Sequence, residues 1–169
     1  MYRTGLGLDT HRLVPDRPLL VGGVRIEAPV GADAHSDGDV LLHALCDALF
    51  GAIGSGDIGE HFPDTDPRWR GAASGQFLEA AAEEVRSAGY RIVNIDATVV
   101  LEKIKLGPLK REIAANLRLL LNPYWALPDD AVSVKAKTNE RCDALGRGEA
   151  IGAHVAVLLE KVVLEKATG

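Results

Sequence analysis

Cysteine is scarce in this sequence of 169 residues, which contains only Cys46 and Cys142. Two thiols cannot form a disulfide framework or a zinc site of four thiolates. Cys46 lies in an apolar run and is expected to be a small core residue, whereas Cys142 stands among polar residues. The first ten residues also lack an apolar core of signal-peptide length. These features predict a protein of the reducing cytoplasm.

Long apolar runs and an excess of positive charge are missing as well. The longest apolar stretch near the C-terminus is interrupted by Glu160 and Lys161 and falls short of the roughly 18 residues that cross a membrane. The net charge is −5, whereas a general nucleic-acid binder needs a basic surface. We therefore expect no membrane and no nucleic acid as partners. A small phosphorylated ligand held by a few local cations remains compatible with this charge.

The length and composition are those of one globular domain. Hydrophobic residues make up 47% and charged residues 25% of the chain, which excludes disorder across its whole length. A chain of this size buries roughly 68–70% of its unfolded surface and needs no cross-links to fold. Residues 1–169 are therefore treated as a single domain without linker or repeat.

Hydrophobic periodicity predicts strands that alternate with helices. Strands are predicted at residues 3–9, 90–101, 131–137 and 151–163, with a hairpin around Gly22-Gly23 at 19–26. Helices are predicted at 40–53, 74–88 and 108–121, and loops at 55–73 and 138–149. The alanine content of 151–163 also permits a helix there.

This order of elements indicates an α+β fold, namely a two-layer α/β sandwich with a mixed, four-stranded main sheet plus a small hairpin. The last predicted strand is apolar on both of its faces. Its second face must therefore also be covered, and another subunit is the candidate cover.

One glycine-rich segment imitates a nucleotide-binding motif. Gly54, Gly56 and Gly59 have the spacing of dinucleotide-binding proteins, whose mechanism needs a strand before the glycines and a helix after them. Here the glycines follow a predicted helix and enter a loop. We interpret them as a helix stop and a flexible turn.

The residues that suit chemistry begin with an Asp-x-His pair. Asp9 and His11 lie at the end of a predicted strand, where a period of two places both side chains on one face. His43 lies on the first predicted helix, and one carboxylate with two imidazoles suits zinc with one tetrahedral position left open. Taken one at a time, a solvated strand end and a satisfied core histidine are the commoner interpretations. Asp47 follows one turn after His43 and either orients its ring or is a solvated charge.

Seven segments, in order along nearly the whole chain, favour the metal-binding interpretation over the commoner ones. They are GLGLDTH at 5–11, AHSDGDV at 34–40, LHAL at 42–45, DIG at 57–59, FPDTDP at 62–67, KAKTNE at 135–140 and GRGE at 146–149. This series closely resembles the 2-C-methyl-D-erythritol 2,4-cyclodiphosphate synthase family of the non-mevalonate isoprenoid pathway. The HSDGD and FPDTDP motifs are long and specific enough to make chance agreement untenable.

The resemblance implies a reaction and an assembly. The 2-phosphate of 4-diphosphocytidyl-2-C-methyl-D-erythritol 2-phosphate attacks the β-phosphate and releases CMP, so the enzyme is a phosphorus–oxygen lyase. Residues 1–169 are then one catalytic domain of a homotrimer, with the sheets packed around the three-fold axis and the active sites between adjacent subunits.

The resemblance also implies roles for individual residues. Asp9, His11 and His43 match the ligands of one Zn²⁺ per subunit, and Glu140 matches a ligand of Mg²⁺ or Mn²⁺ on the substrate diphosphate. His35 and Thr138 match the catalytic residues that stabilise the transferring phosphate. The implied substrate contacts are Asp9, His11, His35, Ser36, Asp57, Ile58, Gly59, Phe62, Pro63, Asp64, Thr65, Asp66, Lys105, Ala136, Lys137, Thr138, Asn139, Glu140 and Arg147.

Two other functions stay open at this point. One is a catalytically idle trimeric protein of the same scaffold that binds a nucleotide or an isoprenoid, although the presence of all the implied chemical residues counts against it. The other is a zinc phosphohydrolase that admits water and gives a linear product.

The sequence departs from the family pattern in three places. Asp143-Ala144-Leu145 replaces a common Gly-Phe, whose aromatic ring lines an axial cavity for an isoprenoid diphosphate. Arg147 and Glu149 remain, either for such a ligand or as a salt-bridged interface. Ile104 replaces a common proline, which predicts a less rigid nucleotide loop, and Leu8 replaces a common phenylalanine in packing.

Overall fold

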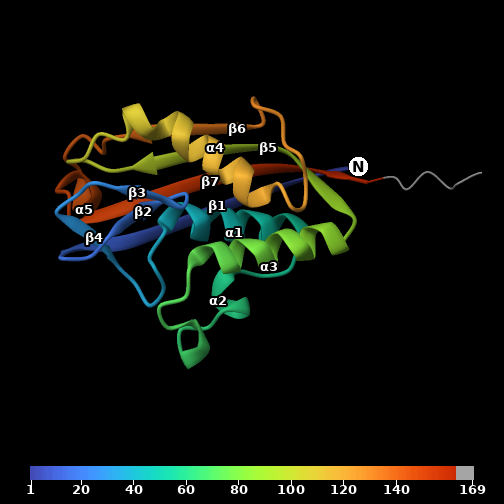
Figure 1. Ribbon diagram of the computed structural model, residues 1–169, viewed down its shortest axis with the longest axis horizontal. Coiled ribbons are helices and arrows are strands. Elements are labelled where there is room, and N and C mark those ends of the chain that lie inside the picture. The colour runs from blue at the N-terminus through green and yellow to red at the C-terminus, as the bar shows by residue number, and fades with distance from the viewer. Residues whose placement is uncertain (163–169) are drawn as a thin grey trace, which may run out of the picture.

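The computed structural model describes residues 1–162 and places them in two layers (Figure 1). One layer is a five-stranded sheet in the order β4-β1-β7-β5-β6. Its strands are β1 (Tyr2–Pro15), β4 (Val30–Asp33), β5 (Tyr90–Val100), β6 (Val132–Lys137) and β7 (Ala150–Lys161). Only β5 and β6 run parallel, which makes the sheet mixed.

Three helices form the other layer, namely α1 (Val40–Ile53), α3 (Ser74–Ser87) and α4 (Lys110–Leu121). Helix α1 packs on β1 and β7, and α4 packs on β6 as the crossover of the parallel pair. A separate hairpin joins β2 (Leu19–Val21) to β3 (Val24–Ile26). Shorter pieces are α2 (Ile58–His61), α5 (Asp143–Gly146) and 3₁₀ turns at Pro67–Trp69 and Gly107–Leu109. None of the helices in residues 1–162 is both long and apolar enough to cross a membrane.

The mixed α+β class is confirmed, but the prediction of a four-stranded main sheet is wrong by one strand. Strand β4 has only four residues, too few to show a period, and it pairs with the end of β1 between Arg12 and Pro15. Because of this pairing, and because β1 pairs with β7 from Tyr2 onward, the first strand extends well beyond the predicted 3–9. The strand at 151–163 is confirmed up to Lys161, and residue 163 lies outside the described residues.

Helix α1 is the centre of the core. Its N-cap Asp39 is fully buried and accepts hydrogen bonds from two backbone N–H groups of the first turn of α1. The same carboxylate accepts the N–H groups of Gly22 and Gly23 at 2.8 and 2.6 Å, which ties the hairpin turn to the helix. The helix ends at Gly54 with a left-handed φ of 76°. The interpretation of the glycine-rich segment as a helix stop is thus confirmed.

Two glycines of β1 let the helix lie directly on the strand. A Cβ atom at Gly5 would stand 1.8 Å from the carbonyl oxygen of Ala48, and one at Gly7 would stand 1.9 Å from that of Ala44. Only glycine fits such an approach of backbone to backbone. This contact brings the residue before Ala44, His43, over the end of β1.

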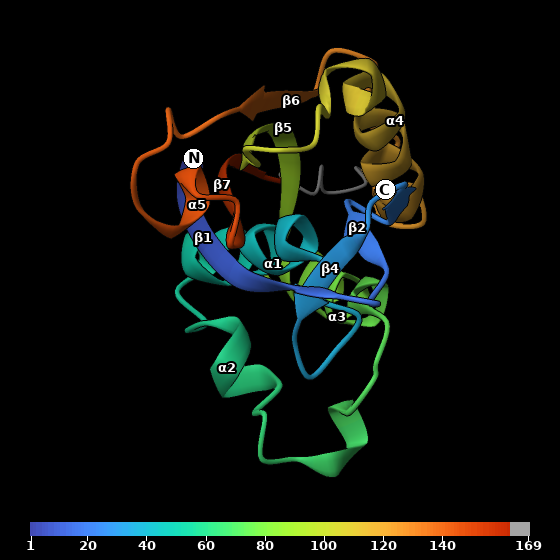
Figure 2. The ribbon, with the colours of Figure 1, turned by 90° about the vertical axis from the view of Figure 1, so that its left-hand side faces the viewer.

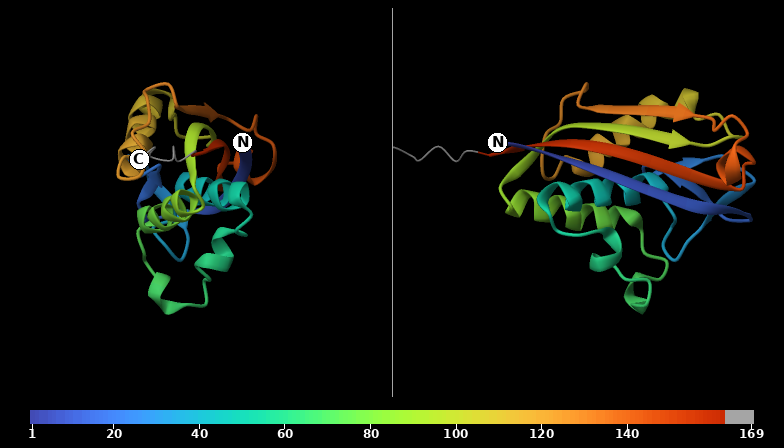
Figure 3. Two further views of the ribbon diagram at one scale, coloured as in Figure 1. Left: turned by 90° about the vertical axis from the view of Figure 1, so that its right-hand side faces the viewer. Right: turned by 180° about the vertical axis from the view of Figure 1, so that it is seen from behind.

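Within residues 1–162, the opposite face of the sheet carries no long helix, only the short α5 at one end, where Leu145 lies over Gly152 (Figure 3, right). Leu6 and Leu8 of β1 are 67% and 52% exposed there, and Ala156 of β7 is exposed beside them. The odd residues of β7, such as Ile151 and Val155, are fully buried against the helices. The single chain therefore leaves an apolar strand face in contact with solvent, as the pattern of the last strand predicted.

Candidate active site

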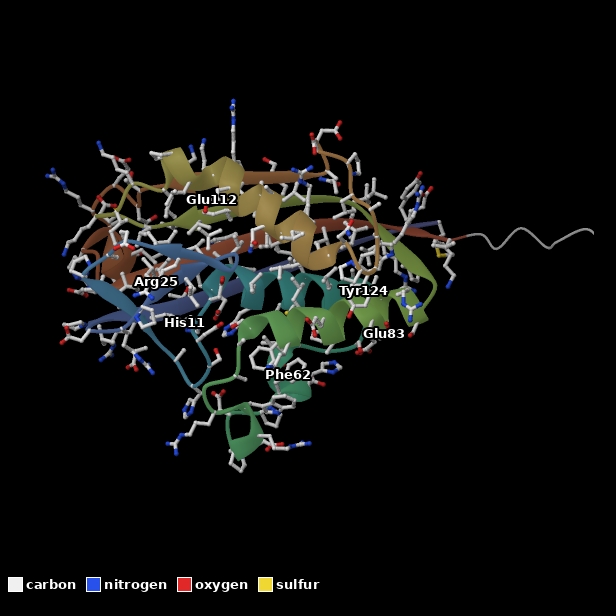
Figure 4. All side chains as sticks on the ribbon, viewed as in Figure 1. His11, Arg25, Phe62, Glu83, Glu112 and Tyr124 are labelled. Atoms are coloured by element: carbon white, nitrogen blue, oxygen red, sulfur yellow. The ribbon has the colours of Figure 1, made fainter. Side chains whose placement is uncertain are left out.

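Three predicted metal ligands converge where β1 passes beneath the first turn of α1, in the region of His11 (Figure 4). Asp9 and His11 come from the face of β1 that meets the helix, and His43 comes from α1. Asp9 Oδ2 lies 3.0 Å from His11 Nε2 and 3.1 Å from His43 Nδ1. His11 Nε2 and His43 Nδ1 lie 3.1 Å apart. The three atoms thus form a nearly equilateral triangle.

This triangle fits a metal ion. Ligands held tetrahedrally at 2.0–2.1 Å from zinc lie about 3.3 Å from one another, slightly farther apart than the three atoms here. The donor set also fits, because a carboxylate oxygen and two imidazole nitrogens facing one another this closely repel unless a proton or a cation lies between them. The predicted clustering of Asp9, His11 and His43 is confirmed.

The surroundings keep the Asp9 carboxylate in its charged form. Burial raises the pKa of Asp9, but hydrogen bonds and charge from His11 and His43 outweigh burial and hold that pKa well below its usual range. An ionised carboxylate is the form that binds a cation.

The second ring nitrogen of His43 points to two hydroxyl groups. Nε2 lies 2.9 Å from Ser74 Oγ and 3.1 Å from Ser36 Oγ. Ser74 is the first residue of α3, is fully buried, and donates its hydroxyl proton to the carboxylate of Asp37. No sequence pattern singled out Ser74, because it lies 31 residues from His43 and meets it only through the packing of α3 on α1.

Asp47 has a role that neither sequence interpretation anticipated. Its Oδ1 accepts the backbone N–H of Ile58 at 2.8 Å and thereby fixes the start of α2. Burial raises the pKa of Asp47, and this hydrogen bond opposes the shift. Within residues 1–162 its carboxylate makes no hydrogen bond to the ring of His43, so the alternative in which Asp47 orients that ring is not supported.

A cavity of about 530 Å³ opens over the three ligands. The predicted site residues that line it are Asp9, His11, His35, Ser36, His43, Ile58, Gly59, Phe62, Pro63, Asp64, Thr65 and Asp66. Trp69 and Phe77, which the sequence did not single out, complete an aromatic wall in which the rings of Phe62 and Phe77 stack at 4.5 Å. Asp57 is exposed at the edge, where its carboxylate caps α2 through the N–H of Glu60.

The segment 57–69, which carries many of these cavity residues, projects from the rest of the molecule. Helix α2 and the turn after it project beyond α1, at the end of the molecule far from α4 and β6 (Figure 2). The loop predicted at 55–73 is confirmed as a connection, although it contains α2 and a short 3₁₀ turn.

The predicted nucleotide-binding residues meet in a second cavity of about 310 Å³. Lys105, Ala136, Lys137 and Thr138 all line it, together with apolar residues such as Leu106. In the described part of the chain, the two cavities share no lining residue.

The remaining predicted residues lie just past this second cavity. Thr138 Oγ1 donates to Glu140 Oε1 at 2.8 Å, and the N–H of Asn139 donates to the carboxylate of Glu102 at 2.8 Å. Arg147 forms an exposed ion pair with Glu149 at 2.9 Å. The salt bridge expected of these last two residues is therefore present, and its place in an interface stays a prediction.

The register of the sheet sets the distance between the two sites. Thr10 of β1 pairs with Gly152, Gly152 pairs with Val100, and Val100 pairs with Lys137. These four residues form one row across the sheet, and three strand spacings span about 14 Å. The metal cluster and the second cavity therefore lie at the same end of the sheet but well apart within one chain.

Comparisons with known proteins identify the family. A family model described as the YgbB family matches residues 2–160. The 2-C-methyl-D-erythritol 2,4-cyclodiphosphate synthase of Bordetella pertussis is 51% identical over 160 residues, covering 95% of this chain and 96% of the relative. The chloroplastic enzyme of that name from Oryza sativa subsp. japonica is 49% identical over 158 residues, covering 94% of this chain and 69% of the relative.

Solved structures agree with this assignment. A CDP-bound 2C-methyl-D-erythritol-2,4-cyclodiphosphate synthase matches with a TM-score of 0.84 and 43% identity over 94% of this chain and 100% of that one. The bifunctional IspDF of Campylobacter jejuni matches with a TM-score of 0.89 and 40% identity, covering 95% of this chain and 42% of that protein. The resemblance carried by the HSDGD and FPDTDP motifs is confirmed, and the chain belongs to the YgbB family of 2-C-methyl-D-erythritol 2,4-cyclodiphosphate synthases.

Proposed function

We propose that this chain converts 4-diphosphocytidyl-2-C-methyl-D-erythritol 2-phosphate into 2-C-methyl-D-erythritol 2,4-cyclodiphosphate and CMP. It would act as a phosphorus–oxygen lyase in non-mevalonate isoprenoid biosynthesis. The observation that carries this function is the convergence of Asp9, His11 and His43 beneath a cavity lined by the HSDGD and FPDTD segments. The names of the relatives and the CDP bound in a related structure support the same chemistry.

Asp9, His11 and His43 would hold one Zn²⁺ per subunit. When bound, the ion supplies Lewis-acid polarisation of a substrate phosphate oxygen. The protein's own part is to present three fixed ligands, one of which stays ionised because its pKa is depressed.

The other residues of the first cavity position the reacting phosphates. His35 and Ser36 present an imidazole and a hydroxyl group to the cavity, where they can donate to oxygens that gain charge. The substrate supplies its own nucleophile, so the protein contributes position rather than a covalent intermediate. The FPDTD segment and the aromatic wall line this cavity and would keep water from the bound substrate, where its attack would give a linear product.

Residues of the second cavity would bind the cytidine diphosphate. Lys105 and Lys137 offer cations to the diphosphate, while Ala136 and the apolar lining suit the nucleoside. Glu140 would hold Mg²⁺ or Mn²⁺, which neutralises the diphosphate and assists the departure of CMP. Thr138 donates its single hydroxyl proton to Glu140 here, and it would turn that proton to the transferring phosphate once Glu140 binds the cation.

One substrate must reach both cavities, although Thr10 beside the metal cluster and Lys137 of the second cavity lie about 14 Å apart across the sheet of one chain. We propose a homotrimer in which the second cavity of one subunit faces the metal cluster of its neighbour. The uncovered strand face with Leu6 and Leu8 supplies the apolar surface that such an assembly would bury. The sheets would then surround the three-fold axis, close to which Arg147 and Glu149 would lie.

The cytoplasm remains the compartment proposed from the low cysteine content. Plant relatives carry the word chloroplastic in their names. Nucleic acid is not expected as a partner, because the net charge of −5 repels a phosphate backbone.

The decisive experiment is incubation with the diphosphocytidyl substrate, zinc and magnesium, followed by phosphorus NMR. The proposal predicts equal amounts of CMP and cyclic diphosphate. CMP with a linear product would instead indicate a phosphohydrolase. Binding of the substrate without release of CMP would indicate an idle nucleotide-binding protein. The His43→Ala variant of this chain serves as the inactive control.

A further inference from the structure

We propose that Ser74 and Asp37 are positioning residues that fix the tautomer of His43, so that Nδ1 is left free to bind the metal. Ser74 opens α3 and contacts His43 on the side of the ring away from Asp9 and His11. Asp37 of the HSDGD segment accepts the hydroxyl proton of Ser74 and so lies one step behind it. This inference rests on the proposed metal site and adds a buried hydrogen-bond relay behind it.

The direction of each hydrogen bond follows from the donors available. An ionised carboxylate only accepts, so the hydroxyl proton of Ser74 must point to Asp37 Oδ1. The oxygen of Ser74 then has only lone pairs to offer at 2.9 Å from His43 Nε2. Nε2 must therefore carry the ring proton, because two lone pairs at that distance would repel. A neutral imidazole protonated at Nε2 is unprotonated at Nδ1, the atom that faces Asp9 and His11.

The relay cannot easily reverse, because its carboxylate is held from several sides. Asp37 Oδ2 accepts the backbone N–H of Ser74 at 3.0 Å, and Oδ1 also accepts that of Asp39 at 3.3 Å. The backbone of Asp37 is fixed in turn by its own N–H, which donates to the carbonyl of Ala72 at 3.0 Å. Ser74 is fully buried, so no water competes for its hydroxyl group.

The two serines beside His43 then have different tasks. Ser36 Oγ lies 3.1 Å from Nε2 and also accepts the N–H of Gly38 at 3.1 Å. Because Nε2 already carries a proton, the hydroxyl proton of Ser36 is free to point into the cavity that this residue lines. Ser74 does not line the cavity. One serine therefore faces the substrate and the other orients the ligand.

The test measures zinc affinity without substrate, by competition with a chelator of known affinity. Removing a partner that orients a metal-binding histidine weakens metal affinity by about 10–100-fold. We expect a loss in this range for Ser74→Ala and a loss in the same direction for Asp37→Asn. Ser36→Ala is the matched control, since it removes the other hydroxyl group at Nε2 but keeps the relay, and its affinity should change by less than about threefold.

A spectroscopic measurement separates orientation from folding. In zinc-loaded protein labelled with ¹⁵N-histidine, NMR should show a protonated Nε2 at His43 whose proton exchanges slowly. In Ser74→Ala that proton should exchange much faster, while thermal unfolding of the metal-free variant shows that the fold is retained.

The outcomes are distinct. Failure of the unaltered protein to bind zinc would overturn the proposed metal site and the relay with it. Zinc binding by the unaltered protein, with Ser74→Ala equal to it in affinity and in the Nε2 signal, would overturn the relay alone. A Ser36→Ala variant as weak as Ser74→Ala would also overturn it, because Ser36 would then be the acceptor.

Discussion

The candidate metal cluster (Asp9, His11 and His43) and the second cavity, which we propose binds the nucleotide and call the nucleotide cavity, are built in different ways. The cluster joins two ligands on β1 to a third on α1, and the two elements are locked together where Gly7 meets the backbone of α1. The nucleotide cavity is made from two short stretches, 101–110 and 136–138. His43 is only 8% exposed, whereas Lys105, Lys137 and Thr138 are exposed.

This difference matches what each site has to do. Holding a metal ion requires donor atoms fixed to within tenths of an ångström, which the packing of a helix on a strand provides. Recognition of a nucleotide tolerates adjustment, and loops at the end of a sheet provide it. Substitutions in the cluster should therefore abolish chemistry, and substitutions in the cavity should weaken binding by degrees.

The largest effect is expected from His43→Ala. The loss of one of three protein ligands should reduce zinc content to background and CMP release below detection, because an ion on two ligands is not retained. The fold and the proposed trimer should persist, since the core around α1 is otherwise unchanged. Metal analysis measures the zinc content of the variant, and size-exclusion chromatography measures its oligomeric state. Full zinc occupancy in the variant would refute the ligand assignment.

Gly7→Ala tests whether packing supports the cluster. The added Cβ would stand 1.9 Å from the carbonyl oxygen of Ala44, so strand and helix must separate. We expect a loss of about 3 kcal/mol in the free energy of unfolding, measured with urea, and weaker zinc binding.

Gly51→Ala is the control for that substitution, because Gly51 lies on α1, the helix that Gly7 packs against, and its new Cβ would have no atom within 4 Å apart from its chain neighbours and the nearby backbone of α1. It should raise stability by about 0.5–1 kcal/mol. Equal stability for the two variants would contradict the view that the cluster depends on this close approach.

The elements of the core could be predicted because their signals are local. The apolar helix at 40–53 has an Asp before it and a glycine after it, and the strands at 90–101 and 131–137 alternate. Asp9 and His11 could be paired because a strand has a period of two. Their meeting with His43 followed from the resemblance, since spacing alone does not tell a ligand from a core histidine.

The features that escaped prediction depend on tertiary contacts. Strand β4 exists because the end of β1 offers a free edge, and its four residues carry no period of their own. Ser74 reached His43 only through the packing of α3 on α1. Asp47 has the right spacing on the helix but turns to the N–H of Ile58 instead.

Glu140→Gln should lower activity less than His43→Ala does but more than Lys105→Ala does. A neutral amide in place of the carboxylate should raise the magnesium concentration for half-maximal activity by about tenfold, because affinity for hard cations depends on the charge of the ligands. Zinc content should stay unchanged, as the cluster lies elsewhere in the chain. A magnesium titration on zinc-loaded protein checks this, and an unaltered titration curve would count against the role of Glu140.

The smallest effect is expected from Lys105→Ala, which removes one exposed cation from the nucleotide cavity. A solvated charge pair is worth about 0.2–1 kcal/mol, so KM should rise by about two- to fivefold while kcat and the unfolding midpoint stay the same. Lys103→Ala is the matched control, because this exposed lysine of the same loop does not line the cavity. Steady-state kinetics decide the matter. If kcat fell with Lys105→Ala as far as we expect for His43→Ala, the loop would share in the chemistry, and the division of labour between rigid cluster and adjustable cavity would not hold.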